Sequence, residues 1–244
     1  MKIPSHNTSD EEREYYSLIR KAFHILAPFY DSITAFDSAL RDKVVDFVSA
    51  ADGSRILDVA TGTGKQALAF ARKGYDVTGI DLSEDMLKVA QKKNTYANMK
   101  LEVGDATDLP FEDNSFDVSC VAFALHDMPP TIREIALKEI ARVTKAKGTV
   151  VVVDYGLPKD KVGRFLVYHI VKLWEKYYPA FIKSDLEALL RQSGIEVRQA
   201  LPVLLGTGRI LRGIKIADDP TTDRPTCAGT GSPGSERAST SSSL

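Results

Sequence analysis

The middle of the chain alternates between short apolar runs and stretches with helical spacing. Each run holds consecutive apolar and often β-branched residues, which is typical of strands buried on both faces of a parallel sheet. Between the runs, apolar residues recur three and four positions apart, as on one face of a helix. The alternation predicts five parallel strands, at 55–59, 75–81, 99–103, 116–123 and 148–154.

Two more apolar runs follow, at 195–201 and 208–217, and we expect them to pair as a hairpin at the sheet edge. The predicted fold class is therefore α/β: a Rossmann-like, seven-stranded, mostly parallel sheet with helices on both faces and a C-terminal antiparallel strand pair. Covering helices are expected from Pro130 to Val143 and from Ser184 to Gly194.

The first fifty residues have a helical pattern. Ser9 and Glu12 have the spacing of a capping box, in which each side chain bonds the backbone N–H of the other residue. The helix that they open is expected to end at Pro28, because proline removes a helical hydrogen bond. A second helix is expected over 36–50. We predict one domain over 1–217, with a helical cap at 1–50 and a core at 51–217.

A helical pattern over 161–178 has an apolar side with lysines interspersed. Three interpretations stay open, in this order: a helix that covers the core, a lid over an apolar substrate, and a helix on a membrane surface. In the third interpretation, the protein would contact the membrane only peripherally, through this helix. From 218 to 244, 17 of 27 residues are Ser, Thr, Gly or Pro, and this composition predicts a disordered tail.

Composition narrows the function classes. The formal net charge of -1 argues against nucleic acid as the main partner, because phosphate binding usually needs a basic surface. The two cysteines indicate neither a disulfide framework nor a thiolate metal site, and we expect no bound metal. No apolar signal region and no membrane-spanning stretch stand out, so the expected location is cytoplasmic. The oligomeric state stays open.

A glycine turn, Thr61 to Gly64, joins the first strand to a helix, which is the usual ligand site of such folds. Its glycines also fit a dinucleotide fingerprint, with Asp81 at the distance expected for a ribose ligand. Asp58 separates the two readings, because a carboxylate below the turn would repel a pyrophosphate but would suit a cationic ligand such as S-adenosylmethionine. A phosphate-binding P-loop is excluded, since Gln66 follows Lys65.

Acidic residues recur just after the predicted strands. Asp58, Asp81, Asp105 and the pair His126–Asp127 all fall at carboxyl ends, where open α/β sheets bind ligands. We therefore expect these side chains to lie along one edge of the sheet.

Five ordered motifs resemble the class I S-adenosylmethionine-dependent methyltransferases, specifically the group of ubiquinone/menaquinone-biosynthesis C-methyltransferases. They lie at 56–64, 77–83, 104–106, 109–117 and 139–148. Two departures stand out: Ala60 replaces a frequent first glycine, and Lys145-Ala-Lys-Gly148 replaces a lysine-proline-glycine turn. The cofactor that the resemblance implies is S-adenosyl-L-methionine.

The resemblance also implies roles for individual residues. Asp58 and the turn would line the methionine part of the cofactor, Asp81 would accept from both ribose hydroxyls, and Asp105 would accept from the adenine amino group. Tyr30 would fold over the cofactor from the N-terminal segment. The full set of implied cofactor residues is Tyr30, Asp58, Ala60, Thr61, Gly62, Gly64, Asp81, Leu82, Asp105 and Ala106.

We expect an enzyme that moves a methyl group from S-adenosylmethionine to a small-molecule acceptor, either quinone-type or another apolar or aromatic metabolite. His126 is the candidate catalytic base, because it titrates near neutral pH and lies in a loop beyond a strand end. Two alternatives stay open. One is an NAD-dependent oxidoreductase, and the other is a non-catalytic subunit that binds the cofactor.

Overall fold

The structure is a computed structural model that describes residues 9–34, 38–158, 163–165, 168–169 and 176–217. All of the seven predicted strands are present. They are β1 (Arg55–Val59), β2 (Asp76–Asp81), β3 (Met99–Val103), β4 (Phe116–Ala122), β5 (Thr144–Tyr155), β6 (Ile195–Val203) and β7 (Gly208–Lys215).

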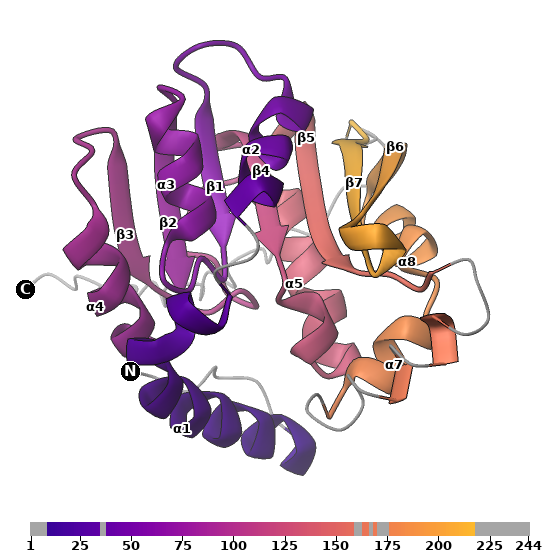
Figure 1. The fold of residues 1–244 in the computed structure, drawn as a ribbon. Coiled ribbons are helices and arrows are strands. Elements are labelled where there is room, and N and C mark those ends of the chain that lie inside the picture. Colours follow the sequence, from indigo (N-terminus) through magenta and orange to yellow (C-terminus); the bar gives the residue numbers. More distant parts are fainter. Residues whose placement is uncertain (1–8, 35–37, 159–162, 166–167, 170–175, 218–244) are drawn as a thin grey trace, which may run out of the picture.

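These strands form a single sheet in the order β3-β2-β1-β4-β5-β7-β6 (Figure 1). The first five strands in this order pair in parallel, and β7 pairs antiparallel with both β5 and β6. The predicted fold class is therefore confirmed. From β1 the chain winds outward through β2 to β3, and it returns to start again at β4 on the other side of β1. Such a reversal marks the position where open α/β sheets bind ligands.

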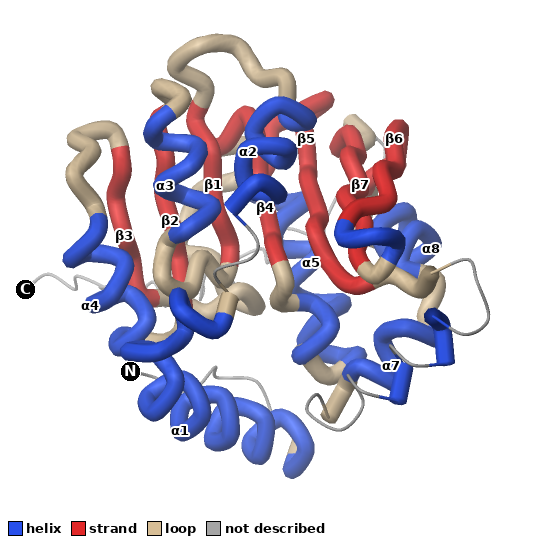
Figure 2. The backbone as a smooth tube through the Cα atoms, in the orientation of Figure 1, coloured by secondary structure: helices blue, strands red, loops and turns tan. Residues whose placement is uncertain are grey.

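Helices cover both faces of the sheet (Figure 2). The helices with described bounds are α1 (Asp10–Ile33), α2 (Ser38–Val48), α3 (Lys65–Arg72), α4 (Glu84–Lys93), α5 (Pro130–Val143), α7 (Tyr178–Lys183) and α8 (Leu186–Gln192), and the described residues also include the short 3-10 turns η2 (Leu125–Asp127) and η3 (Leu204–Gly206). Successive strand residues point to opposite faces. Ile56 accordingly packs with α2 and α3, and Leu57 packs with α5 and α8.

Helix α1 lies across the carboxyl edge of the sheet (Figure 1). The predicted end at Pro28 was wrong, because the helix continues through Pro28 to Ile33. Proline removes one helical hydrogen bond, but the turn beyond it is fixed by other contacts. The Thr34 backbone N–H donates to the Tyr30 carbonyl, 3.0 Å away, and Asp31 bonds the glycine turn. Tertiary contacts thus outweigh the local cost of the proline.

Several other boundaries can be compared with the predictions. The capping box of Ser9 and Glu12 is confirmed. Helix α8 begins at Leu186, two residues after the predicted start at Ser184, because the side chain of Asp185 caps it by accepting from the N–H of Ala188. Strand β5 begins at Thr144, four residues before the predicted start, because the turn at 145–148 lies within an irregular pairing with β4.

Two predictions fall largely or wholly on residues that the structure does not describe. The helix at 161–178 is described only at 163–165, 168–169 and 176–178, and the tail at 218–244 lies outside the described residues. The proposed division at 50 and 217 stays a prediction. Among the described helices, none is both long and apolar enough to cross a bilayer.

Candidate functional site

The glycine turn leaves β1 with three residues in left-handed conformation. They are Ala60 (φ 54°), Gly62 (φ 56°) and Gly64 (φ 77°). Glycine adopts this conformation without strain, whereas alanine does not. A side chain at Gly64 would also place its Cβ 2.9 Å from the Cβ of Ala90 on α4. The turn therefore needs a residue without a side chain at Gly64.

Asp58 lies beneath this turn and is only 1% exposed. The Thr61 hydroxyl donates to its carboxylate, with 2.6 Å between Oγ1 and Oδ2. Burial raises the pKa of Asp58 to about 6, although the Thr61 hydrogen bond and the charge of Arg41 act in the opposite direction. The turn therefore has a desolvated negative charge directly below it.

Asp81 ends β2 beside the same turn. Its carboxylate accepts from the N–H of Gly62 at 2.7 Å and from the N–H of Ser83 at 2.8 Å, one bond to each oxygen. Burial raises the pKa of Asp81, and these two backbone bonds lower it again in part. A carboxylate has about four acceptor sites, so Asp81 keeps acceptor capacity for a ligand diol.

Asp105 follows β3 and has one oxygen without a partner. Its Oδ1 accepts from the N–H and the hydroxyl of Thr107, at 2.9 and 2.8 Å. Its Oδ2 is buried and has no hydrogen-bond partner in the part of the chain that the structure describes. A buried acceptor that is left without a hydrogen bond costs about 1–3 kcal/mol of stability. A ligand amino group would satisfy this oxygen, as the adenine of S-adenosylmethionine would.

Helix α1 is fastened over this edge near both of its ends. At its carboxyl end, Asp31 accepts from the Thr63 hydroxyl at 2.6 Å and pairs with Lys93 on α4 at 2.5 Å. Partial burial raises the pKa of Asp31, but the bonds from Lys93 and Thr63 outweigh it, so that the pKa is lowered. Toward its amino end, the Tyr16 hydroxyl lies 3.4 Å from that of Thr107, and the Thr131 hydroxyl donates to Glu12 at 3.0 Å.

Tyr30 immediately precedes Asp31, and we call the contacts of Asp31 with Thr63 and Lys93 the Asp31 clamp. It is half-buried, and its ring packs edge-on against Phe23, with 6.1 Å between the ring centroids. The clamp holds this part of α1 against the glycine turn, so the predicted residue lies on the segment that covers the turn.

His126 lies in the 3-10 turn η2 after β4, on the other half of the carboxyl edge. It is 5% exposed, and its Nδ1 lies 2.7 Å from Oδ1 of Asp154 at the end of β5. Its ring packs edge-on against Tyr155 at 4.6 Å and near Phe181 at 6.3 Å. The neighbouring Asp127 is half-buried.

The predicted residues thus fall into two groups. Around the glycine turn the structure brings together Asp58, Thr61, Gly62 and Asp81 through direct hydrogen bonds, and the Gly104 N–H joins the Asp105 segment to the Asp81 carbonyl at 3.0 Å. Leu82 and Ala106 are half-buried against the core. His126 lies apart, beyond β4. We call these two groups the cofactor half (β1, β2, β3 and the glycine turn) and the acceptor half (η2, the end of β5, and α7).

Three further residues were not predicted as part of the site. Asp31 fastens α1, Asp154 holds His126, and Arg133 is a fully buried charge on α5. Two of them carried a signal: Asp154 ends a strand as Asp58 does, and Arg133 falls on the apolar face of its helix, in register with Ala136 and Ile140. The contacts of Asp31 with Thr63 and Lys93 could not be predicted from the spacing of residues in the sequence.

Residues 56–148 match a family described as a methyltransferase domain. A demethylmenaquinone methyltransferase of Paenarthrobacter aurescens (strain TC1) is 33% identical over 172 residues, covering 68% of this chain and 62% of that protein. One of Staphylococcus aureus (strain JH9) is 37% identical over 149 residues, covering 57% and 61%. The chain thus spans about three fifths of the length of these curated relatives.

A solved structure is similar in fold. It is a complex between the Haloferax volcanii Trm112 methyltransferase activator and a putative methyltransferase, with a TM-score of 0.66 and 17% identity over 80% of this chain and 97% of that one. At this identity the likeness concerns the fold alone.

Proposed function

We propose that this chain, whose residues 56–148 belong to the methyltransferase domain family, transfers a methyl group from S-adenosylmethionine to a small aromatic acceptor of quinone type. The observation that carries the proposal is the arrangement of three carboxylates around one glycine turn, with a buried oxygen of Asp105 that still needs a donor. This set of acceptors complements a ligand with a cationic end, a diol and an amino group.

The residues of the cofactor half suit the separate parts of this cofactor. Asp58 and the turn from Ala60 to Gly64 would face its methionine end, Asp81 its ribose, and Asp105 its adenine. When bound, the cofactor supplies a methyl group already activated on a sulfonium. The protein's own task is then alignment, and correct positioning of reactants contributes about 7–11 kcal/mol in favourable cases.

The buried charge of Asp58 disfavours a dinucleotide. It is 1% exposed and sits under the turn that would contact a pyrophosphate. Two like charges in a poorly solvated cleft repel one another strongly. For a sulfonium and an ammonium group the same charge is attractive.

The acceptor half suits a small aromatic acceptor. Tyr155 and Phe181 pack against His126, and Tyr178 packs on Tyr155. The buried Tyr178 hydroxyl has no hydrogen-bond partner among the described residues. An acceptor with a ring and a hydroxyl would match both features. The two curated relatives, named for demethylmenaquinone, support a reduced quinone as this acceptor.

His126 is the residue that we assign to proton removal. A phenolic acceptor must lose a proton for its ring carbon to become nucleophilic, and a positioned base typically contributes about 10²–10⁴ in rate. Histidine is the side chain that most often serves as such a base.

Two measurements test the proposal. Calorimetry should show binding of S-adenosylhomocysteine and none of NAD, and the opposite result would overturn it. A panel of quinols, phenols and amines with labelled methyl donor should then give transfer to a quinol. Binding of S-adenosylhomocysteine without transfer to any acceptor would instead support a non-catalytic cofactor-binding protein.

A further inference from the structure

The carboxylate of Asp154 is fully buried at the end of β5, at 0% exposure, and takes no part in the cofactor half. It accepts three hydrogen bonds: from Nδ1 of His126 at 2.7 Å, from the His126 backbone N–H at 3.2 Å, and from the Tyr155 N–H at 2.7 Å. An ionised carboxylate can only accept, so the proton of this pair lies on Nδ1. The basic lone pair of the neutral ring is then on Nε2.

A second buried group fixes the turn that carries His126. Arg133 is 1% exposed, and its guanidinium donates to the carbonyl of Leu125 and to the carbonyl of Met128, both at 2.8 Å. These carbonyls flank His126 on either side. A charge buried in this way is costly unless it is paired and hydrogen-bonded. Arg133 therefore holds η2 in one position while Asp154 holds the imidazole in one orientation.

The surrounding charges are spread over several elements. Arg133 from α5 and Arg209 from β7 both lie over the Phe181 ring, at 4.9 and 5.9 Å, and the charge of Asp154 reaches both guanidiniums. The negative charge of Asp154 is therefore shared with two cations and does not require a charged imidazole. Among the described residues, the titratable and charged groups near the pair are Arg133, Tyr155, Tyr178 and Arg209, and Asp127 follows His126 in η2.

We propose that Asp154 is a positioning residue that holds His126 as the Nδ1–H tautomer, so that Nε2 takes the proton of a phenolic hydroxyl on the methyl acceptor. This inference rests on the proposed function. In the step, the acceptor O–H bond breaks and an N–H bond forms at Nε2. The electron pair stays on the acceptor oxygen and makes the ring carbon nucleophilic. The proton then passes from Nε2 to solvent water.

The first test uses the wild-type protein without acceptor. ¹⁵N NMR of the histidine rings, with His126→Gln to assign the signal, should show a proton on Nδ1 and an unprotonated Nε2 at alkaline pH. In Asp154→Asn the Nε2–H tautomer should gain population, because the amide no longer demands a donor. A wild-type ring protonated on Nε2 alone would overturn the proposal without any variant or activity measurement.

The second test is kinetic. Asp154→Asn should keep its affinity for S-adenosylhomocysteine and lower kcat by about tenfold to a hundredfold. The deficit should shrink as the pH rises toward the pKa of the acceptor hydroxyl, because an ionised acceptor needs no base. The matched control is Asp117→Asn, which removes a hydrogen-bonded carboxylate near the start of β4, at the sheet edge opposite His126. An unchanged kcat in a folded Asp154→Asn would overturn the proposal.

A double variant separates positioning from general structural support. If Asp154 acts through His126, adding Asp154→Asn to His126→Ala should lower kcat no further than His126→Ala does alone. Independent, multiplying losses would contradict the proposal. Should no acceptor be methylated at all, the proposed function fails, and the NMR result alone decides whether Asp154 orients His126.

Discussion

The two halves of the carboxyl edge are built in different ways. In the cofactor half, most carboxylate bonds reach groups two or three residues along the chain, as Asp58 does with Thr61 and Asp105 does with Thr107, and the longer bond is that of Asp81 with Gly62. In the acceptor half, His126 bonds Asp154, 28 residues away, and the two arginines meet over Phe181 on α7. The first half is therefore encoded largely by local sequence, and the second depends on the folded sheet and its helices.

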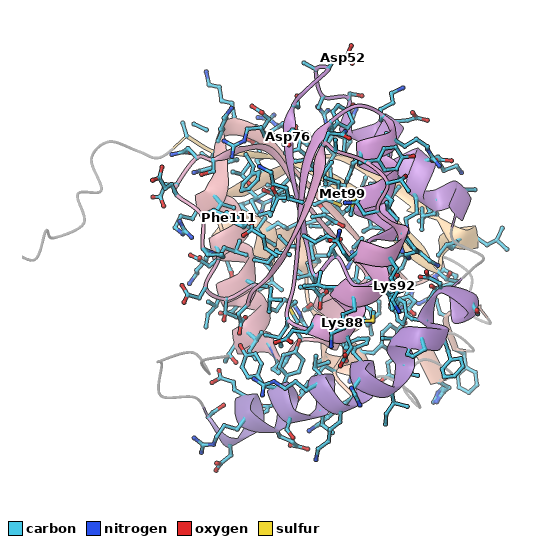
Figure 3. The ribbon with its side chains drawn as sticks, turned by 90° about the vertical axis from the view of Figure 1, so that its left-hand side faces the viewer. Asp52, Asp76, Lys88, Lys92, Met99 and Phe111 are labelled. Carbon is cyan, nitrogen blue, oxygen red and sulfur yellow. The ribbon has the colours of Figure 1, made fainter. Side chains whose placement is uncertain are left out.

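The largest effect that this comparison predicts is at Asp81, the anchor of the cofactor half. Asp81→Ala should weaken binding of S-adenosylhomocysteine by about a hundredfold or more, because two charge-assisted hydrogen bonds of about 1.5–3 kcal/mol each are lost. Isothermal calorimetry would measure the change. The control is Asp76→Ala at the start of the same strand, which lies at the edge opposite α1 (Figure 3). Equal affinities of Asp81→Ala and wild type would show that the diol is held elsewhere.

The next effect concerns stability. The folded pKa of Asp58 is about 6, above its ordinary value of 3.8, so the folded chain binds more protons than the unfolded chain between these pH values. The free energy of unfolding should therefore fall by about 3 kcal/mol as the pH rises from about 4 to above 6. Asp58→Asn has no such titration.

Urea unfolding of both proteins at pH 4.5 and pH 7.5 measures this contribution. The stability advantage of Asp58→Asn over wild type should be larger at pH 7.5. A constant difference between the two proteins would show that Asp58 is not desolvated. Asp58→Asn should also bind S-adenosylhomocysteine more weakly. The charge of Asp58 would then lower the stability of the protein and strengthen ligand binding.

A smaller effect is expected at the clamp of α1. Asp31→Asn keeps the shape of the side chain but removes its charge, and it should weaken S-adenosylhomocysteine binding about three- to tenfold, because the ion pair is partly exposed and screened. The matched control is Asp42→Asn on α2, which breaks the exposed pair of Asp42 with Arg72 on α3. An effect as large for the control would show that general charge, not the clamp, sets the affinity.

The smallest effect is expected at Ala60. Its left-handed φ of 54° is strained for alanine by about 1–2 kcal/mol, and the entropy that glycine adds to the unfolded chain offsets part of the gain. Ala60→Gly should therefore raise the free energy of unfolding by up to about 1 kcal/mol in urea. A loss of more than about 1 kcal/mol would show that the methyl group packs favourably.

The same contrast explains what the sequence could predict. Strand positions and the acids Asp58, Asp81 and Asp105 followed from apolar runs and their ends, because these features are local. The continuation of α1 past Pro28 did not, because contacts from Asp31 to Thr63 and Lys93 outweigh the proline. The partners of His126 also needed the fold, since Asp154 and Arg133 become its neighbours only when β5 and α5 pack beside β4.

The unequal fastening of α1 has a consequence for the order in which ligands exchange. Its amino half is held by Tyr15 and Tyr16, which are buried in the core, whereas its carboxyl end is held by the part-buried carboxylate of Asp31 with a hydroxyl and a lysine. Exposed contacts open more readily than buried ones. We expect α1 to swing from its carboxyl end about these two tyrosines, so that the cofactor half is uncovered first. The cofactor could then exchange while α1 still covers the acceptor half.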